Sequence, residues 1–145
     1  MNIEIVNKQS RIDIYGFSAV AQNKEYAETA LRLSGEMWKT VKSNNLKNKG
    51  INIWVCEHGD LVFAGVELED IPEHDIGLER KIIILTKYAY YKHVGPYQMI
   101  KQVGLNMQAE LKSKGFETSL QYIEVYGHWT NDETKLETEL IMCLK

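Results

Sequence analysis

Long apolar runs, paired cysteines and an excess of basic residues are all missing from this sequence of 145 residues. No apolar run approaches the roughly 18 residues of a membrane span, and the N-terminal residues lack the apolar core of a signal peptide. The net charge of −3 provides no basic field that would attract nucleic acid or an anionic membrane surface. We therefore expect a cytoplasmic protein that binds neither membranes nor nucleic acid directly.

Cysteine is scarce, and metal-binding motifs are missing. Cys56 and Cys143 lie in apolar segments without the spacing of a metal or redox motif, so we interpret them as buried free thiols rather than a disulfide. The four histidines show no ligand spacing such as HExxH. We interpret His93 as a strand-end residue with a backbone partner, in preference to a metal ligand or a base. No metal site and no cofactor are predicted.

The composition that remains is that of an ordinary globular domain. Hydrophobic residues make up 44% of the chain and charged residues 26%, which argues against a disordered tail. A chain of this size buries roughly 68–70% of its extended surface on folding, enough for a core without disulfides or metals. We predict one domain over residues 1–145.

Two segments show the hydrophobic spacing of amphipathic helices. Residues 25–41 carry the stripe Ala27, Ala30, Leu31, Met37, Trp38 and Val41, continued by Ser34, and residues 96–116 carry Met99, Ile100, Val103, Met107 and Leu111. In the second segment Pro96 suits the first helical turn, where its missing N–H is not needed. Gly115 suits a left-handed C-terminal cap.

Each predicted helix is followed by two strand-like runs, the pattern of a β-hairpin. Residues 51–68 turn at Gly59 and Asp60, and residues 120–145 turn at the polar stretch 130–134. Extended sequence also precedes each helix, at residues 3–6 and 11–20 in one half and at 81–85 and 88–94 in the other. This order of elements predicts an α+β fold.

The two halves of the chain match each other at an offset of 70 residues, which carries Ile53 to Ile123 and Trp54 to Glu124. An even offset preserves the face of a strand to which each side chain points. The match therefore indicates an internal repeat. A chance likeness between two amphipathic βαββ segments is the alternative.

We predict two tandem βαββ repeats, at about residues 1–75 and 76–145, related by a pseudo-twofold axis. The linker between them is expected at residues 70–81, which include Pro72 and Gly77. The repeats would form an antiparallel sheet with both helices on one face and a ligand cleft between the halves.

One strand carries a carboxylate between two aromatic rings. In "LQYIEVY", Tyr122, Glu124 and Tyr126 point to the same face. Aromatic faces attract cations, and an ionised carboxylate in a partly dry pocket adds a longer-range attraction. The pseudo-twofold axis would bring Trp54 close to Glu124 at the centre of the sheet. The alternative is an exposed glutamate that faces a lysine across a half-solvated sheet.

Other aromatic residues leave two interpretations open. Trp38 lies on the apolar stripe of the first helix, so it is either a core residue or a flat wall at the rim of the cleft. Tyr91 and Phe63 are further candidates for the cleft, with Tyr15 and Trp129, and no local pattern separates them from core or surface residues.

Four segments resemble the GyrI-like small-molecule-binding family. "YAYYKHVGPYQMI" resembles that family's junction between an aromatic-rich strand and a helix opened by His-x-Gly-Pro-Tyr, with His93, Gly95, Pro96 and Tyr97 in those places. "GEMWKTV", "FAGVEL" and "YIEVYG" resemble other pieces of the family, in the same order along the chain. The chain departs from the family in lacking the proline that is common before the strand at residues 88–94.

The resemblance implies a tandem βαββ fold with a cleft in which a glutamate faces lipophilic cations inside an aromatic cage. The glutamate maps to Glu124. The candidate ligand-binding residues are Glu124, Trp38, Trp54, Tyr126, Tyr91, Tyr97, Tyr122 and Phe63. We therefore expect a stand-alone effector-binding module for lipophilic, above all cationic, small molecules, with no helix-turn-helix for DNA.

Two other functions stay open. Some GyrI-like proteins hydrolyse strained electrophilic molecules, and here Glu124 would activate a water while Tyr126 or Tyr97 donates a proton. Relatives of the gyrase-inhibitor type act instead by contact with another protein. No catalytic residue is assigned, and both a protein partner and a homodimer remain open.

Overall fold

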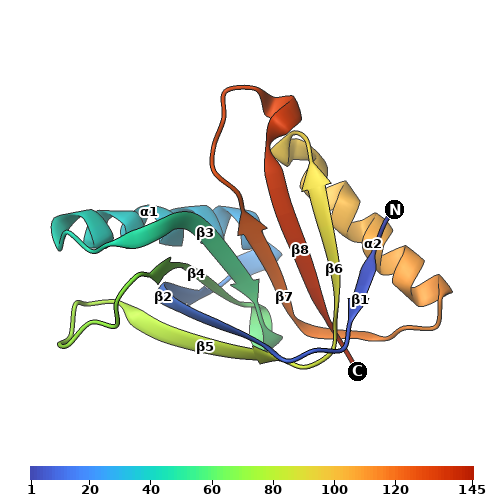
Figure 1. Cartoon of the computed structure of the whole chain (residues 1–145), viewed down its shortest axis with the longest axis horizontal. Coiled ribbons are helices and arrows are strands. Elements are labelled where there is room, and N and C mark those ends of the chain that lie inside the picture. Colours follow the sequence, from blue (N-terminus) through green and yellow to red (C-terminus); the bar gives the residue numbers. More distant parts are fainter.

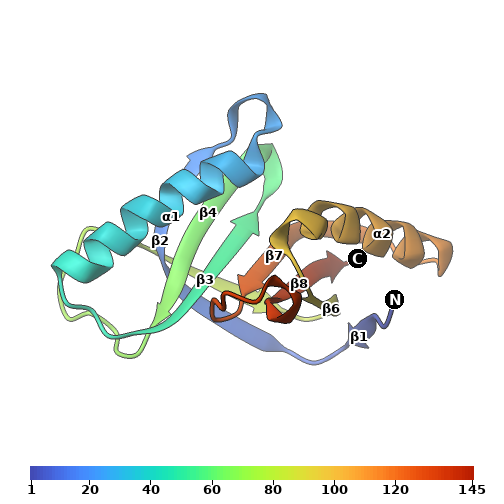
Figure 2. The same ribbon diagram turned by 90° about the horizontal axis from the view of Figure 1, so that it is seen from above.

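The computed structural model describes all residues 1–145 and confirms the α+β class (Figure 1). The strands are β1 (Glu4–Val6), β2 (Ser10–Val20), β3 (Asn48–Cys56), β4 (Leu61–Leu68), β5 (Glu79–Leu85), β6 (Tyr88–Val94), β7 (Thr118–Tyr126) and β8 (Glu137–Leu144), and the helices are α1 (Tyr26–Ser43) and α2 (Ile100–Ser113). One antiparallel sheet contains all eight strands. Both helices lie on the same face of it (Figure 2). Neither helix combines the length and the apolarity needed to cross a membrane.

Each of the strands β1 to β4 has a counterpart among β5 to β8, and the two members of each pair lie equally far from opposite ends of the sheet, as a pseudo-twofold axis requires. It runs β1-β6-β8-β7-β3-β4-β2-β5, so β3 and β7 meet at the centre. There Trp54 is paired directly with Glu124, its counterpart at the offset of 70 residues. The axis therefore passes between these two residues, and the predicted approach of Trp54 to Glu124 is confirmed.

The first strand of each half crosses to the other half. β1 pairs with β6, and β5 pairs with β2, so the two halves exchange edge strands. The predicted linker 70–81 was too long, because β5 begins at Glu79. Each unit is thus a βαββ repeat with an additional strand that extends its partner's part of the sheet.

The helices cover the sheet with stripes that differ in part from the predicted ones. In α1 the buried residues include Leu33 and Ser34, whereas Leu31 is 66% exposed. Leu31 was wrongly placed on the stripe because the face set by Ala30, Met37 and Val41 continues through position 33 or 34, not 31. The predicted Ala27 lies on the correct face but is exposed in the first turn of α1, and Met99 is exposed because it precedes α2 in a short 3-10 turn. Gly115 has φ +83° at the end of α2, which confirms the left-handed cap.

A second apolar layer lies on the face away from the helices. Ile53 and Val55 of β3 point into it, together with Ile123 of β7, while Trp54 points toward the helices. The same cluster includes Ile12 and Ile14 of β2 and residues of β5, so the sheet bends around it (Figure 1). The inward-pointing residues of the central strands are therefore buried on the face away from the helices.

Candidate functional site

A cavity of about 590 Å³ opens between the two halves, where the cleft was predicted. Its walls come from residues 24–28 at the beginning of α1 and from residues 97–108 in and before α2. Its floor consists of Trp54 from β3, Tyr122, Glu124 and Tyr126 from β7, and Met142 from β8. Aromatic rings and one carboxylate thus meet at the point where the pseudo-twofold axis crosses the sheet.

Glu124 is partly buried on this floor and is held by two tyrosines. The Tyr122 hydroxyl donates a hydrogen bond to Oε2 at 2.5 Å, and the Tyr126 hydroxyl donates to Oε1 at 2.6 Å. Its cross-strand neighbours are Trp54 and Leu140. The alternative of an exposed glutamate opposite a lysine is therefore wrong, because both cross-strand positions are apolar.

Burial and the charge of Glu124 keep the neighbouring tyrosine hydroxyls and the Cys56 thiol protonated. Burial, followed by the negative charge of Glu124, raises the pKa of Tyr122 and of Tyr126 well above that of a free tyrosine. Both phenols therefore act as hydrogen-bond donors at neutral pH. The same two causes raise the pKa of Cys56 to about 11. Its thiol is thus a poor nucleophile, since the thiolate is the reactive form.

An aromatic chain extends from the floor of the cavity to its rim. The Trp54 ring lies 4.7 Å from the Tyr126 ring, centroid to centroid, and the Tyr126 ring lies 5.5 Å from that of Tyr97 in an edge-to-face arrangement. Trp54 Nε1 donates to Ser34 Oγ of α1 at 2.8 Å, which fixes the plane of the indole. This chain gives the cavity a rigid apolar wall next to the carboxylate.

Five of the eight predicted ligand-binding residues line the cavity: Glu124, Trp54, Tyr97, Tyr122 and Tyr126. Trp38 lies outside it, and its Nε1 donates to Asn52 Oδ1 at 2.6 Å. Tyr91 packs against the core under α2, beside β1. Phe63 is 3% exposed in the apolar layer behind the sheet, because it pairs with Val55 and shares that residue's face. Trp38, Tyr91 and Phe63 therefore do not line the cavity, and their prediction as ligand contacts finds no support in its geometry.

Several lining residues were not predicted from the sequence. Gly104 leaves space above the Tyr122 hydroxyl, and it occupies the position in α2 that corresponds to Ser34 in α1 at the offset of 70 residues. That offset was the signal that could have found it. The rim carries Lys24, Glu25, Glu28 and Lys101, two charges of each sign. No sequence pattern marked these, because surface charges occur on every solvated helix end.

His93 has the backbone partner that was predicted. Its Nε2 lies 3.1 Å from the carbonyl oxygen of Pro96, and the ring is 5% exposed. This contact closes the junction between β6 and the turn that leads into α2. No three His, Cys, Asp or Glu side chains lie together in the way that a metal ion would need.

No protein-family model matches the sequence, and no curated protein does. Among solved structures, the C-terminal domain of EcmrR superposes with a TM-score of 0.74 at 12% identity, over 100% of this chain and 99% of that domain. SAV2435 bound to tetraphenylphosphonium gives 0.64 at 18% identity, over 100% and 94% of the two chains. A hydrolase from Listeria innocua gives 0.51 at 12% identity, over 96% and 92%. At these identities the likeness shows the fold, and the chain has the fold of GyrI-like effector-binding domains, as its sequence resemblance predicted.

Proposed function

We propose that this protein binds lipophilic small molecules, above all cations, in the cavity between its two halves. Glu124 supplies the charged contact, and Trp54, Tyr97, Tyr122 and Tyr126 surround it. The observation that carries this proposal is the position of Glu124 on the floor of an aromatic cavity, with neutral phenols as its hydrogen-bond donors.

Glu124 forms no ion pair within the protein, and its side-chain partners are the two tyrosines. Tyrosine hydroxyls satisfy its oxygens but leave its negative charge in place. A partly buried charge without an ionic partner is unfavourable, and a bound cation relieves that cost. The rings add cation–π attraction of roughly 0.5–2 kcal/mol each, depending on how much water is removed.

The size and lining of the cavity fit a ligand of several rings. A volume of about 590 Å³ lies within the range of small-molecule sites. SAV2435, whose structure contains tetraphenylphosphonium, supports this class, since that ligand is a cation whose charge is enclosed by four phenyl groups. Aromatic walls tolerate many shapes, so we expect the cavity to accept ligands of different shapes but to discriminate strongly between cations and anions.

The test uses tetraphenylphosphonium and tetraphenylborate, which have nearly the same shape and opposite charge. The wild-type protein should bind the cation and reject the anion. Glu124→Gln keeps the size of the side chain and removes its charge, so affinity for the cation should fall by about 1–3 kcal/mol. Calorimetric titration measures both ligands, with neutral triphenylphosphine oxide as a reference that Glu124→Gln barely affects.

Glu36→Gln is the matched control. Glu36 is exposed on α1 and does not line the cavity, so its replacement changes net charge equally without touching the site. Equal losses of the cation and of the neutral compound in Glu124→Gln would contradict the charged contact. Equal losses in the two glutamate variants would mean that only the overall charge matters.

A second candidate function is hydrolysis of strained electrophiles in the same cavity. The hydrogen bond between Tyr126 and Glu124 favours it, because that contact joins an acid to a base. Glu124 would take a proton from water as the water oxygen bonds to the electrophilic carbon. Tyr126 would protonate the atom released when the strained bond breaks, and the proton on Glu124 would then return to Tyr126. The solved Listeria innocua structure described as a hydrolase supports this alternative through its fold.

Product analysis separates the two functions. The hydrolytic function predicts that an aryl epoxide incubated with the wild-type protein yields the diol and that Glu124→Gln abolishes that product. Tyr126→Phe should slow turnover while tetraphenylphosphonium still binds. If no diol forms while the cation binds with the expected charge selectivity, the protein is a binding module and the hydrolytic alternative is excluded.

A further inference from the structure

The cavity has a second pair of a tyrosine and a carboxylate, on the wall formed by the beginning of α1. Tyr26, the first residue of α1, lines the cavity, and its hydroxyl donates to Asp60 Oδ1 at 2.6 Å. A separation of about 2.5–2.7 Å is typical of a hydroxyl that donates to an ionised carboxylate. This hydrogen bond raises the pKa of Tyr26, so the phenol remains the donor at neutral pH. Unlike Glu124, Asp60 does not line the cavity itself.

The Tyr26 ring stands apart from the aromatic chain of the cavity. The rings of Trp54, Tyr126 and Tyr97 contact one another in sequence. No aromatic ring of the protein stacks on Tyr26, which is partly buried against the small apolar cluster around Ala30 beneath α1. Tyr26 therefore provides an aromatic surface on the α1 wall of the cavity, whereas Tyr97 belongs to the α2 wall.

Asp60 holds the segment that leads into α1 at both of its ends. Its carbonyl oxygen accepts from the Ala21 N–H at 2.8 Å, and its carboxylate accepts from the Tyr26 hydroxyl. Asp60 lies in the tight turn between β3 and β4, where Gly59 has φ +76° and Asp60 itself has φ +59°. Aspartate adopts this left-handed conformation more readily than most residues. The turn therefore places the carboxylate where it can fix the Tyr26 ring.

We propose that Tyr26 is a ligand contact that favours cations over neutral molecules, and that Asp60 is its positioning residue. This inference rests on the proposed function, because it assigns a second source of charge selectivity to the same cavity. Ring faces attract cations. A hydrogen bond to a carboxylate polarises the phenol and increases the electron density on its ring. Asp60 thus acts on a bound cation through Tyr26, from outside the cavity.

The role of the ring is tested by calorimetric titration with tetraphenylphosphonium and with neutral triphenylphosphine oxide. Tyr26→Ala should weaken binding of the cation by about tenfold and of the neutral compound by about twofold, because both lose apolar contact but only the cation loses the attraction of the ring face. Tyr26→Phe keeps the ring and loses the hydrogen bond. It should weaken binding of the cation by about threefold and leave the neutral compound almost unaffected. Urea denaturation shows that each variant is folded.

The role of Asp60 is tested in a double-mutant cycle with Tyr26. Asp60→Asn keeps an acceptor for the Tyr26 hydroxyl but removes the charge, and it should weaken binding of the cation by about threefold. In the Tyr26→Phe background the same substitution should have no further effect, because the hydroxyl through which Asp60 acts is then missing. A purely structural role of Asp60 would instead weaken the cation and the neutral compound equally.

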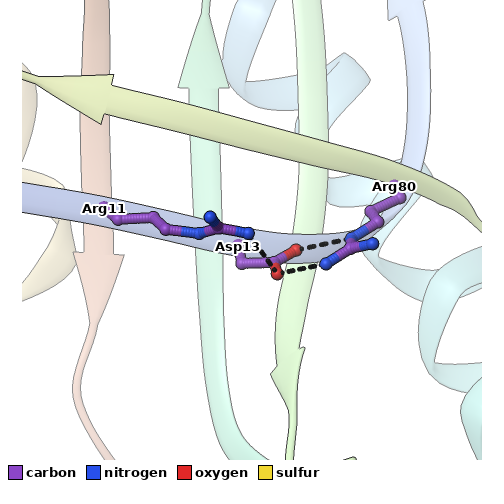
Figure 3. Close-up of polar contacts among 3 residues, drawn as sticks. All are labelled: Arg11, Asp13 and Arg80. Carbon is purple, nitrogen blue, oxygen red and sulfur yellow. Dashed lines mark hydrogen bonds and ion pairs between the residues drawn. The ribbon is translucent and has the colours of Figure 1, made fainter. Parts of the chain in front are cut away.

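Asp13→Asn is the matched control. Asp13 lies on β2 and does not line the cavity. Its oxygens accept from Nε and Nη2 of Arg80 at 3.0 and 2.7 Å, and from Arg11 at 3.4 Å (Figure 3). The substitution changes the net charge as Asp60→Asn does and removes the charge from more hydrogen bonds. It should therefore leave the affinity for both compounds unchanged.

The outcomes separate this inference from the proposed function. A wild-type chain that does not bind tetraphenylphosphonium would overturn both. If the wild type binds the cation and Glu124→Gln weakens that binding, equal losses of the cation and the neutral compound in Tyr26→Ala would overturn this inference alone. Losses from Tyr26→Phe and Asp60→Asn that simply add in the double variant would overturn the positioning role of Asp60.

Discussion

The two halves share one scaffold, but they hold their helices differently. α1 buries six side chains against the sheet, whereas α2 buries three. At corresponding positions in the helices stand Ser34, which is 5% exposed and bonded to Trp54, and Gly104, which faces the cavity. At this position α1 is thus packed onto the sheet through a side chain, whereas α2 leaves a space that forms part of the cavity.

The central strands show the same contrast in chemistry. In the first half both indole N–H groups are satisfied within the protein, Trp38 by Asn52 and Trp54 by Ser34. In the second half the counterpart of Trp54 is Glu124, whose charge has no ionic partner. A duplicated fold can therefore keep one copy as a rigid support and place an uncompensated charge in the other.

The largest effects are expected when leucine replaces Ser34 in α1 and Gly104 in α2, because the first position is packed and the second faces the cavity. Ser34→Leu forces a larger group into a packed site and removes the acceptor for Trp54 Nε1. Overpacking and an unpaired buried donor each cost about 1–3 kcal/mol, so we expect unfolding free energy to fall by about 2–4 kcal/mol in urea denaturation.

Gly104→Leu should leave the stability of the fold intact and instead weaken ligand binding. A Cβ at this position would lie 3.6 Å from the Tyr122 hydroxyl and 3.9 Å from Leu140 Cδ2, which are ordinary contacts. Stability should hold or rise by up to about 1 kcal/mol, because leucine favours helix over glycine. Affinity for tetraphenylphosphonium should fall at least about tenfold, since the side chain extends into the cavity. A variant as unstable as Ser34→Leu would show that the halves are packed alike.

The sequence predicted the centre of the fold better than its edges. The offset that relates Trp54 to Glu124 placed both residues correctly, because strand alternation fixes which face each side chain occupies. The exchange of β1 and β5 was missed. The alternation of side chains along a strand shows which face of the sheet each residue occupies, but it does not show which strand lies next to it. The short strands at residues 4–6 and 79–85 could equally have paired within their own halves.

Residues of the candidate site could be predicted from the sequence wherever the pairing of neighbouring strands could be counted through a turn. Phe63 was misplaced although the turn at residues 58–60 pairs it with Val55, which points away from Trp54. Counting through that turn would have excluded it. Trp38 could not be settled in this way, because its position depends on the bond to Asn52 and on the distance of α1 from the sheet. The spacing of apolar residues along a helix reveals neither that hydrogen bond nor that distance.

The smallest expected difference between the halves concerns Cys56 and its counterpart Tyr126. Burial and the Glu124 charge raise the pKa of the Cys56 thiol to about 11. In the unfolded chain the thiol ionises near pH 8.5–9, so this group stabilises the fold fully below that range. Its contribution is lost as pH rises from about 9 to 11, because only the unfolded chain then releases the proton.

Replacing the thiol should therefore make stability less sensitive to alkaline pH. Between pH 8 and pH 10 the unfolding free energy of Cys56→Ala should fall by about 1 kcal/mol less than that of the wild type, after allowance for the partial exposure of the group. Cys143→Ala is the control, since the pKa of Cys143 is also raised by burial but no carboxylate contributes. Urea denaturation at the two pH values measures the difference. If Cys143→Ala changes the pH dependence as much as Cys56→Ala does, burial alone accounts for the raised pKa of Cys56, and the charge of Glu124 adds nothing measurable to it.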